Sequence, residues 1–110
     1  MRQYLLQVAY TPEAWASLLK SPHSPLEAVR PAVEKLSGKL DTGWFCFGDY
    51  DLVAVLNMPD NVSAAAFSLA ASAGGGVRAI KTTPLLSTDE GVETMKKAAT
   101  AGYKPPKSKP

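Results

Sequence analysis

The sequence predicts an α+β domain in which four antiparallel strands form one sheet and helices cover one of its faces. Short aromatic and β-branched runs alternate with longer segments whose apolar residues recur every three or four positions. The two central strand runs are separated only by a short polar segment around Gly48, which is typical of a hairpin. A chain of 110 residues has the length of one domain.

The first strand and the first helix follow each other directly. Residues 3–10, QYLLQVAY, alternate weakly with a period of two, which indicates a strand. Thr11 is a favourable N-cap and Pro12 suits the first helical position. A helix should therefore begin at Pro12 and carry Trp15, Leu18 and Leu19 on one face.

The two prolines of SPHSP, residues 21–25, interrupt this helix, and a second helix should restart at Pro25 or Leu26. Pro31 lies inside the new helix and predicts a kink or a fresh first turn. Gly38 is expected to end the helix in the left-handed conformation. The apolar stripe of this helix consists of Leu26, Val29, Val33 and Leu36.

The second half of the chain repeats the pattern. An Ala-rich segment predicts a helix packed closely on the sheet, and Gly74-Gly75-Gly76 should end it. Ser87 and Glu90 have the spacing of a capping box, so a final helix should begin there. We expect strands over 39–47, 50–57 and 77–86, a helix over 61–73, and a last helix reaching about Ala101.

This order is the split β-α-β arrangement, a ferredoxin-like βαββαβ fold with an extra C-terminal helix. We expect one domain over residues 1–101. The tail GYKPPKSKP, residues 102–110, should be extended or disordered.

The apolar pattern of the hairpin predicts that the protein associates with a second copy. A two-residue turn at Gly48-Asp49 would pair Phe47 with Tyr50 and Cys46 with Asp51. Cross-strand partners share a face, so both faces of this hairpin would be mainly apolar. One helical layer covers only one face, and a large exposed apolar face implies a partner. We therefore predict a homodimer formed sheet face against sheet face.

Three polar residues of the hairpin are candidates for a site. Asp49 is best explained as a turn residue. Tyr50 would either pair with Phe47 or donate a hydrogen bond to a ligand. In the predicted register Asp51 lies on the face of Trp44, where a carboxylate needs a partner. That partner would be an arginine such as Arg78 or Arg30, backbone amides, or a ligand.

Other polar residues are weaker candidates. Arg78 could hold a small anionic ligand, or it could protect an edge strand together with Lys81. Tyr10 ends the first strand and is either a rim residue of the core or a ligand contact. His23 lies in a loop and is either idle or a proton carrier. Cys46 is expected to be a small buried apolar residue.

Composition excludes several classes of protein. The net charge is only +2, and the lysines gather in the tail rather than in a patch on the body, which disfavours nucleic-acid binding. One cysteine and one histidine cannot form an ordinary zinc site, and we expect no metal and no cofactor. The start, MRQYLLQVAY, is too short and too interrupted for a signal peptide or a membrane span, so we expect a cytoplasmic protein without membrane contact.

Several segments together resemble the GYD-domain proteins: YLLQVAYT, AVRPAVEKLSGKL, FGDYDLVAVLNMPDN, SAAAFSLAASAGGGVRAIKTTPLL and ETMKKA. The likeness spans about residues 4–103. Gly48, Tyr50 and Asp51 match the family's Gly-Tyr-Asp signature, with Asp49 inserted between the glycine and the tyrosine. The resemblance implies a ferredoxin-like fold of the dimeric α/β-barrel kind and no particular activity.

The sequence favours a homodimeric small-molecule-binding or regulatory domain, because no nucleophile with its base, metal-ligand set or cofactor motif is visible. Its ligand would be a small anionic or aromatic molecule held by Trp44, Arg78 and Tyr10. The alternative is a cofactor-independent enzyme of the monooxygenase or isomerase type, by analogy of fold. Asp51 would then be the acid/base and Tyr50 the hydrogen-bond donor. A structural or partner-docking domain is the third interpretation.

Overall fold

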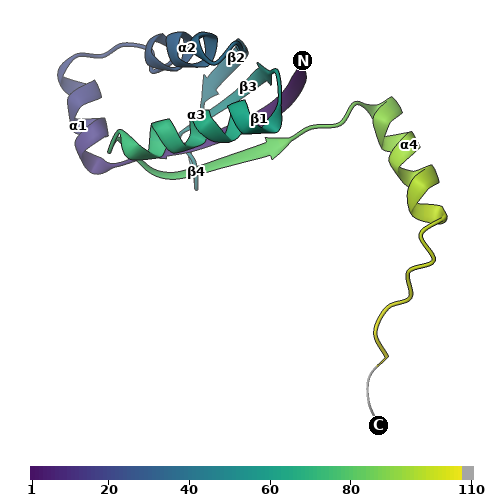
Figure 1. The fold of residues 1–110 in the computed structure, drawn as a ribbon. Helices are drawn as coiled ribbons and strands as arrows, with labels where there is room; N and C mark the ends of the chain where they lie inside the picture. The colour runs from purple at the N-terminus through teal and green to yellow at the C-terminus, as the bar shows by residue number, and fades with distance from the viewer. Residues whose placement is uncertain (108–110) are drawn as a thin grey trace.

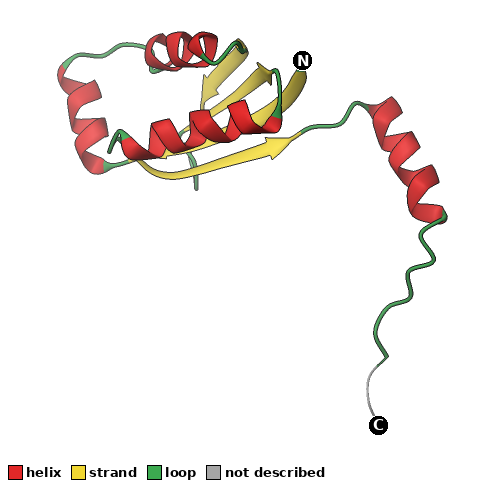
Figure 2. Ribbon diagram, viewed as in Figure 1, coloured by secondary structure: helices red, strands yellow, loops and turns green. Residues whose placement is uncertain are grey.

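A computed structural model of the protein describes residues 1–107 and contains one open antiparallel sheet, one face of which is covered by helices (Figures 1 and 2). The strand order is β2-β3-β1-β4, so the ferredoxin-like α+β fold is confirmed, including the extra C-terminal helix. The strands are β1 Arg2–Tyr10, β2 Lys39–Phe45, β3 Leu52–Met58 and β4 Val77–Pro84. The helices are α1 Pro12–Lys20, α2 Leu26–Lys35, α3 Asn61–Ala73 and α4 Thr88–Ala99.

The core lies between the sheet and the helices α2 and α3. Alternate residues of the central strands β1 and β3 point into it, as the period of two requires. From the helices, Val33 of α2 and Phe67 of α3 close the core. The strand residues of the core cluster are Tyr4, Leu6 and Val8 of β1, Leu40 of β2, and Leu52, Ala54, Leu56 and Met58 of β3.

Helix α1 begins at Pro12 as predicted, and the Thr11 side chain accepts the Ala14 amide at 3.1 Å. The expectation of one packed face is wrong for Leu19, which is 76% exposed, whereas Trp15 is half-buried. The reason is position: α1 lies beyond one end of the strands rather than over the sheet (Figure 1). Only its first turns therefore reach the body of the protein.

The prediction that Gly38 ends α2 in the left-handed conformation is wrong. Ser37, not Gly38, takes the left-handed conformation, with φ at +64°. A Cβ on Gly38 would lie 2.4 Å from Met58 Sδ and 2.8 Å from the Asn57 carbonyl oxygen. Glycine is needed here because the chain passes closely against β3, not because of its backbone freedom.

The β2–β3 hairpin keeps the predicted register but has a wider loop. Phe45 pairs with Leu52, and the Cys46 amide donates to the Asp51 carbonyl at 2.9 Å. Beyond that bond the strands separate, and Phe47 is 98% exposed rather than paired. Residues 47–50 therefore form a four-residue loop, in which Gly48 has a φ of +146° that side chains disfavour.

The face of the sheet that carries no helix is called the open face here. Its centre holds Leu5, Val53 and Val55, which are half-buried, and Trp44, which is 57% exposed. The prediction of a mainly apolar face holds for Trp44, Val53 and Val55 of the hairpin, whereas Thr42 of β2 and residues of β1 and β4 add polar groups to the same cross-strand rows. The registers place Gln7, Lys81 and Thr83 in these rows.

Candidate functional site

Asp51 lies where the hairpin loop enters β3, and it joins three elements. Its Oδ2 accepts the Tyr10 amide of β1 at 2.8 Å and the indole Nε1–H of Trp15, on α1, at 3.3 Å. Its own amide donates to the Val8 carbonyl at 2.8 Å. A carboxylate is favoured at this position because two N–H donors converge on one of its oxygens.

Aromatic rings surround this carboxylate. Tyr10 meets the Trp15 ring edge-on at 5.6 Å between centroids, and Trp15 stacks on Phe45 at 6.1 Å. Burial, and then the negative charge of Asp51, raises the pKa of Tyr10 to about 12. The phenol therefore stays protonated at any physiological pH and can serve as a hydrogen-bond donor.

Among the partners considered for Asp51, the structure contains the backbone amide and not an arginine. The carboxylate also lies against α1, at the Trp15 indole, and not on the face of Trp44. The predicted face is wrong for this side chain because Asp51 precedes the first paired residue of β3, where the loop turns it towards α1.

A groove of about 330 Å³ lies between α2 and α3 and is called the helix groove here. Its walls are apolar except at Tyr10 and His23, and its volume is at the lower end of the range for small-molecule sites. No lysine or arginine lines it. The lining consists of Tyr10, His23, Pro25, Ala28, Val29, Ala32, Phe67, Ala70, Ala71 and Val77.

The polar atoms of the helix groove are complementary. Nδ1 of His23 lies 2.6 Å from the Ser21 carbonyl oxygen, which can only accept, so Nδ1 carries the proton. With the proton on Nδ1, the other ring nitrogen, Nε2, is an acceptor. Within residues 1–107, no protein group bonds to the Tyr10 hydroxyl, which leaves one donor and one acceptor for a ligand.

The three predicted ligand contacts do not come together. Tyr10 lines the helix groove, whereas Trp44 lies on the open face, on the other side of the sheet. Arg78 is exposed on β4 and reaches the Asp49 carbonyl at 3.5 Å. Tyr50 is half-buried in the hairpin loop, where its carbonyl accepts the Cys46 thiol at 3.2 Å.

Sequence reasoning did not identify Trp15, which bonds to Asp51, or Phe67, which lines the helix groove. Phe67 is the one aromatic residue in an Ala-rich helix, a signal that it fills space beside small neighbours. Trp15 lies five residues after Tyr10, and only the short strand-to-helix connection at Thr11 brings the two rings into contact.

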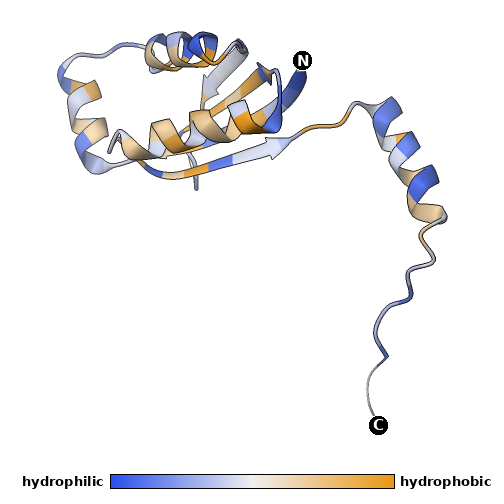
Figure 3. Cartoon of the chain, viewed as in Figure 1, coloured by the Kyte–Doolittle hydropathy of each residue, from blue (hydrophilic) through white to orange (hydrophobic). Residues whose placement is uncertain are grey.

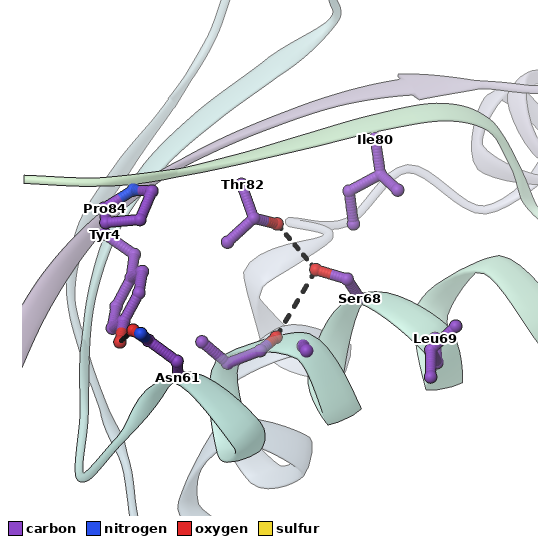
Figure 4. Close-up of a pocket in the computed structure, with 9 residues that line it drawn as sticks. Tyr4, Asn61, Ser68, Leu69, Ile80, Thr82 and Pro84 are labelled. Carbon is purple, nitrogen blue, oxygen red and sulfur yellow. Dashed lines mark hydrogen bonds between the residues drawn. The ribbon is translucent and has the colours of Figure 1, made fainter.

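A second groove, called the edge groove here, lies between α3 and the edge strand β4 and has a volume of about 440 Å³. Its polar side chains satisfy one another. The hydroxyls of Ser68 and Thr82 are 2.6 Å apart, and the Tyr4 hydroxyl donates to Asn61 (Figure 4). The remaining walls are apolar and include Leu69, Ile80 and Pro84. This groove offers shape and apolar surface rather than free polar groups.

Two searches within residues 1–107 found nothing. No group of three or more histidine, cysteine, aspartate or glutamate residues is arranged to hold a metal ion. No helix in this part of the chain has both the length and the apolar character needed to cross a bilayer.

Comparison with known proteins gives a family. The GYD domain family model matches residues 4–95. No curated protein and no solved structure matches the chain at a significant level. The match includes the signature residues Gly48, Tyr50 and Asp51, two of which have visible structural roles, in the loop and at the strand–helix junction. Since the match covers most of its 110 residues, the chain belongs to the GYD domain family.

Proposed function

We propose that the protein is a homodimeric small-molecule-binding domain and that the helix groove is its ligand site. The observation that carries this proposal is that Tyr10 and His23 are the two polar residues lining an otherwise apolar groove. A few polar groups in an apolar pocket orient a ligand, while the walls supply most of the affinity.

The lining selects the class of ligand. Tyr10 donates to a carbonyl or ether oxygen, and Nε2 of His23 accepts from a hydroxyl or N–H group. Because no lysine or arginine lines the groove, a neutral aromatic or alicyclic ketone or phenol suits it better than an anion. Arg78, the predicted anion contact, is on β4 and outside this lining.

Binding is favoured over catalysis by the position of Asp51. Both of its donors engage the same oxygen, and Asp51 does not line the helix groove. A general base must reach the proton that it removes. Asp51 instead acts as a positioning residue, because its bond to the Tyr10 amide fixes the backbone that carries the Tyr10 ring.

The site can be tested with Prodan, a neutral aromatic ketone whose fluorescence reports polarity. We expect a blue-shifted emission on binding to the full-length protein. Ala70→Trp fills the mouth of the groove from α3 and should abolish the shift, whereas Ala73→Trp, three residues further on the exposed end of the same helix, should not. Tyr10→Phe should weaken binding about five- to tenfold, the value of one hydrogen bond. Equal binding by both tryptophan variants would contradict the proposed site.

The open face supports the dimer. Trp44, Val53, Val55 and Leu5 form an apolar centre that Gln7 of β1 interrupts, while Lys39, Lys81 and Thr83 lie towards the outside. An apolar centre with a polar rim is the usual anatomy of a protein interface, and tryptophan is enriched at its most important positions.

A further inference from the structure

Within residues 1–107, helix α4 has no packing partner in its own chain. It is amphipathic, none of its residues is buried, and it projects away from the sheet (Figure 1). Its apolar residues Val92, Met95 and Ala99 have a spacing of three and four residues and form the α4 stripe. Val92 and Met95 are 43% and 65% exposed. An isolated helix of 12 residues is marginal in water, so this stripe needs a surface to pack against.

Helix α3 presents the complementary surface. It contains no charged residue, which is unusual for a helix with one side in water. Figure 3 shows it white to orange along almost its whole length, whereas α4 alternates with blue. Val62, Ala65 and Leu69 form the α3 stripe, in which Val62 and Leu69 are 79% and 72% exposed. Ala65 and Leu69 also line the edge groove.

We propose that α4 of one copy packs into the edge groove and against the α3 stripe of a second copy. The α4 stripe would lie on Leu69 and Ile80, which line the groove away from the end formed by Tyr4, Asn61 and Pro84 (Figure 4). The groove lining carries no charge, so the lysines and acids on the other side of α4 would stay in solvent.

The path of the chain favours the groove of another copy. The Leu85 amide donates to the Gln3 carbonyl at 2.9 Å, which holds the chain beside β1 after β4 has ended. The capping box of Ser87 and Glu90 then fixes the start of α4. Only Leu86 separates these two restraints, and α4 continues outward from the end of β4 instead of folding back over α3 (Figure 1).

A second copy on the open face would also reach the edge groove. β4 borders both surfaces, because Ala79, Lys81 and Thr83 share the rows of the open face while Ile80, Thr82 and Pro84 line the groove. Two exchanged helices, each about 18 Å long and about 10 Å wide, would hide on the order of 700 Å². Stable interfaces bury about 1,200–2,000 Å². The exchange therefore adds to the sheet contact and rests on the dimer of the proposed function.

Disulfide trapping tests this exchange in the full-length chain. Cys46→Ser removes the native thiol, and Leu69→Cys with Met95→Cys places one thiol on each stripe. Oxidation should give a covalent dimer on a non-reducing gel. The matched control replaces Met95→Cys with Lys97→Cys, two residues further and on the polar side of α4, and should yield at least tenfold less dimer.

Each other outcome overturns the proposal. A compact monomer with an internal disulfide would show that α4 folds onto its own α3. A covalent dimer from Met95→Cys alone would show that two α4 helices pair with each other. No cross-link in a protein that still sediments as a dimer would remove the exchange and leave the sheet-face dimer intact. A protein that sediments as a monomer would contradict both the helix exchange and the sheet-face dimer.

Discussion

Asp51 shows how a signature residue can serve the site without touching the ligand. Its carboxylate receives the Tyr10 amide and the Trp15 indole, and its amide is bonded to Val8. These bonds hold the end of β1, the start of β3 and α1 together. Asp51, the third signature residue, therefore has a structural role. Its bond to the Tyr10 amide fixes the orientation of Tyr10.

Replacing Asp51 should reveal this role. Asp51→Ala leaves the Tyr10 amide and the Trp15 indole without their acceptor, so we expect a loss of about 1–3 kcal/mol in the free energy of unfolding. Asp51→Asn keeps an oxygen acceptor and should lose less. Asp49→Ala, in the exposed loop, should change stability by less than about 0.5 kcal/mol. Urea unfolding followed by tryptophan fluorescence measures all three; equal stability of Asp51→Ala and wild type would refute the role.

The raised pKa of Tyr10 predicts a pH dependence. The phenol titrates at 10.0 in its ordinary state and at about 12 in the fold, so the folded state retains this proton longer than the unfolded chain. The stability that comes from the neutral phenol is complete below pH 10 and is lost as the pH rises from 10 towards 12.

Tyr10→Phe removes that titration. The variant should unfold at nearly the same urea concentration as wild type at pH 7, and its stability should fall less steeply between pH 10 and 11.5. Tyr103→Phe, in an exposed position outside the fold, serves as the control and should follow the wild type. Parallel curves for wild type and Tyr10→Phe would show that the hydroxyl is not held in its neutral form.

At the scale of elements, the sequence predicted what depends on neighbours along the chain. The caps at Thr11 and Ser87 and the glycine stop after α3 are confirmed, because each is a contact within a few residues. The width of the hairpin loop and the exposure of Leu19 were missed, because they depend on contacts with distant elements. The helix groove was invisible for the same reason: its walls come from β1, β4, two helices and a loop.

Alanine substitutions at Gly38 and Gly91 distinguish the effect of side-chain packing from the effect of backbone freedom. Gly38→Ala places a Cβ against Met58 and the Asn57 carbonyl, so we expect overpacking to cost about 1–3 kcal/mol. Gly91→Ala lies in α4, where nothing is within 4 Å of the new Cβ, and should increase helicity. Circular dichroism with thermal unfolding measures both. A Gly38→Ala variant as stable as wild type would contradict the close approach of the chain at residue 38 to β3.

At the scale of the whole molecule, three surfaces of the single chain are without partners: the open face, the α3 stripe and the α4 stripe. An exposed apolar surface of this extent marks an interaction site. Sequence patterning predicted the first surface from the hairpin. The other two required knowing that α4 leaves the body and that α3 turns Val62 and Leu69 to solvent.

A substitution at the centre of the open face tests the dimer. Trp44→Glu places a charge in the apolar part of the open face, and we expect it to raise the dissociation constant at least tenfold. Leu19→Glu changes a more exposed apolar residue on α1 and should leave the dimer unaffected. Sedimentation equilibrium distinguishes the two. If Trp44→Glu dimerises as tightly as Leu19→Glu, the open face is not the interface.

Native mass spectrometry of the full-length protein titrated with Prodan is the decisive measurement for the dimer and its ligand site, because it weighs the assembly and the bound molecules together. We expect a dimer that takes up to two molecules of the probe, no uptake by Ala70→Trp and unchanged uptake by Ala73→Trp. A monomer, a dimer that takes up no probe, or uptake that Ala70→Trp leaves unchanged would contradict it.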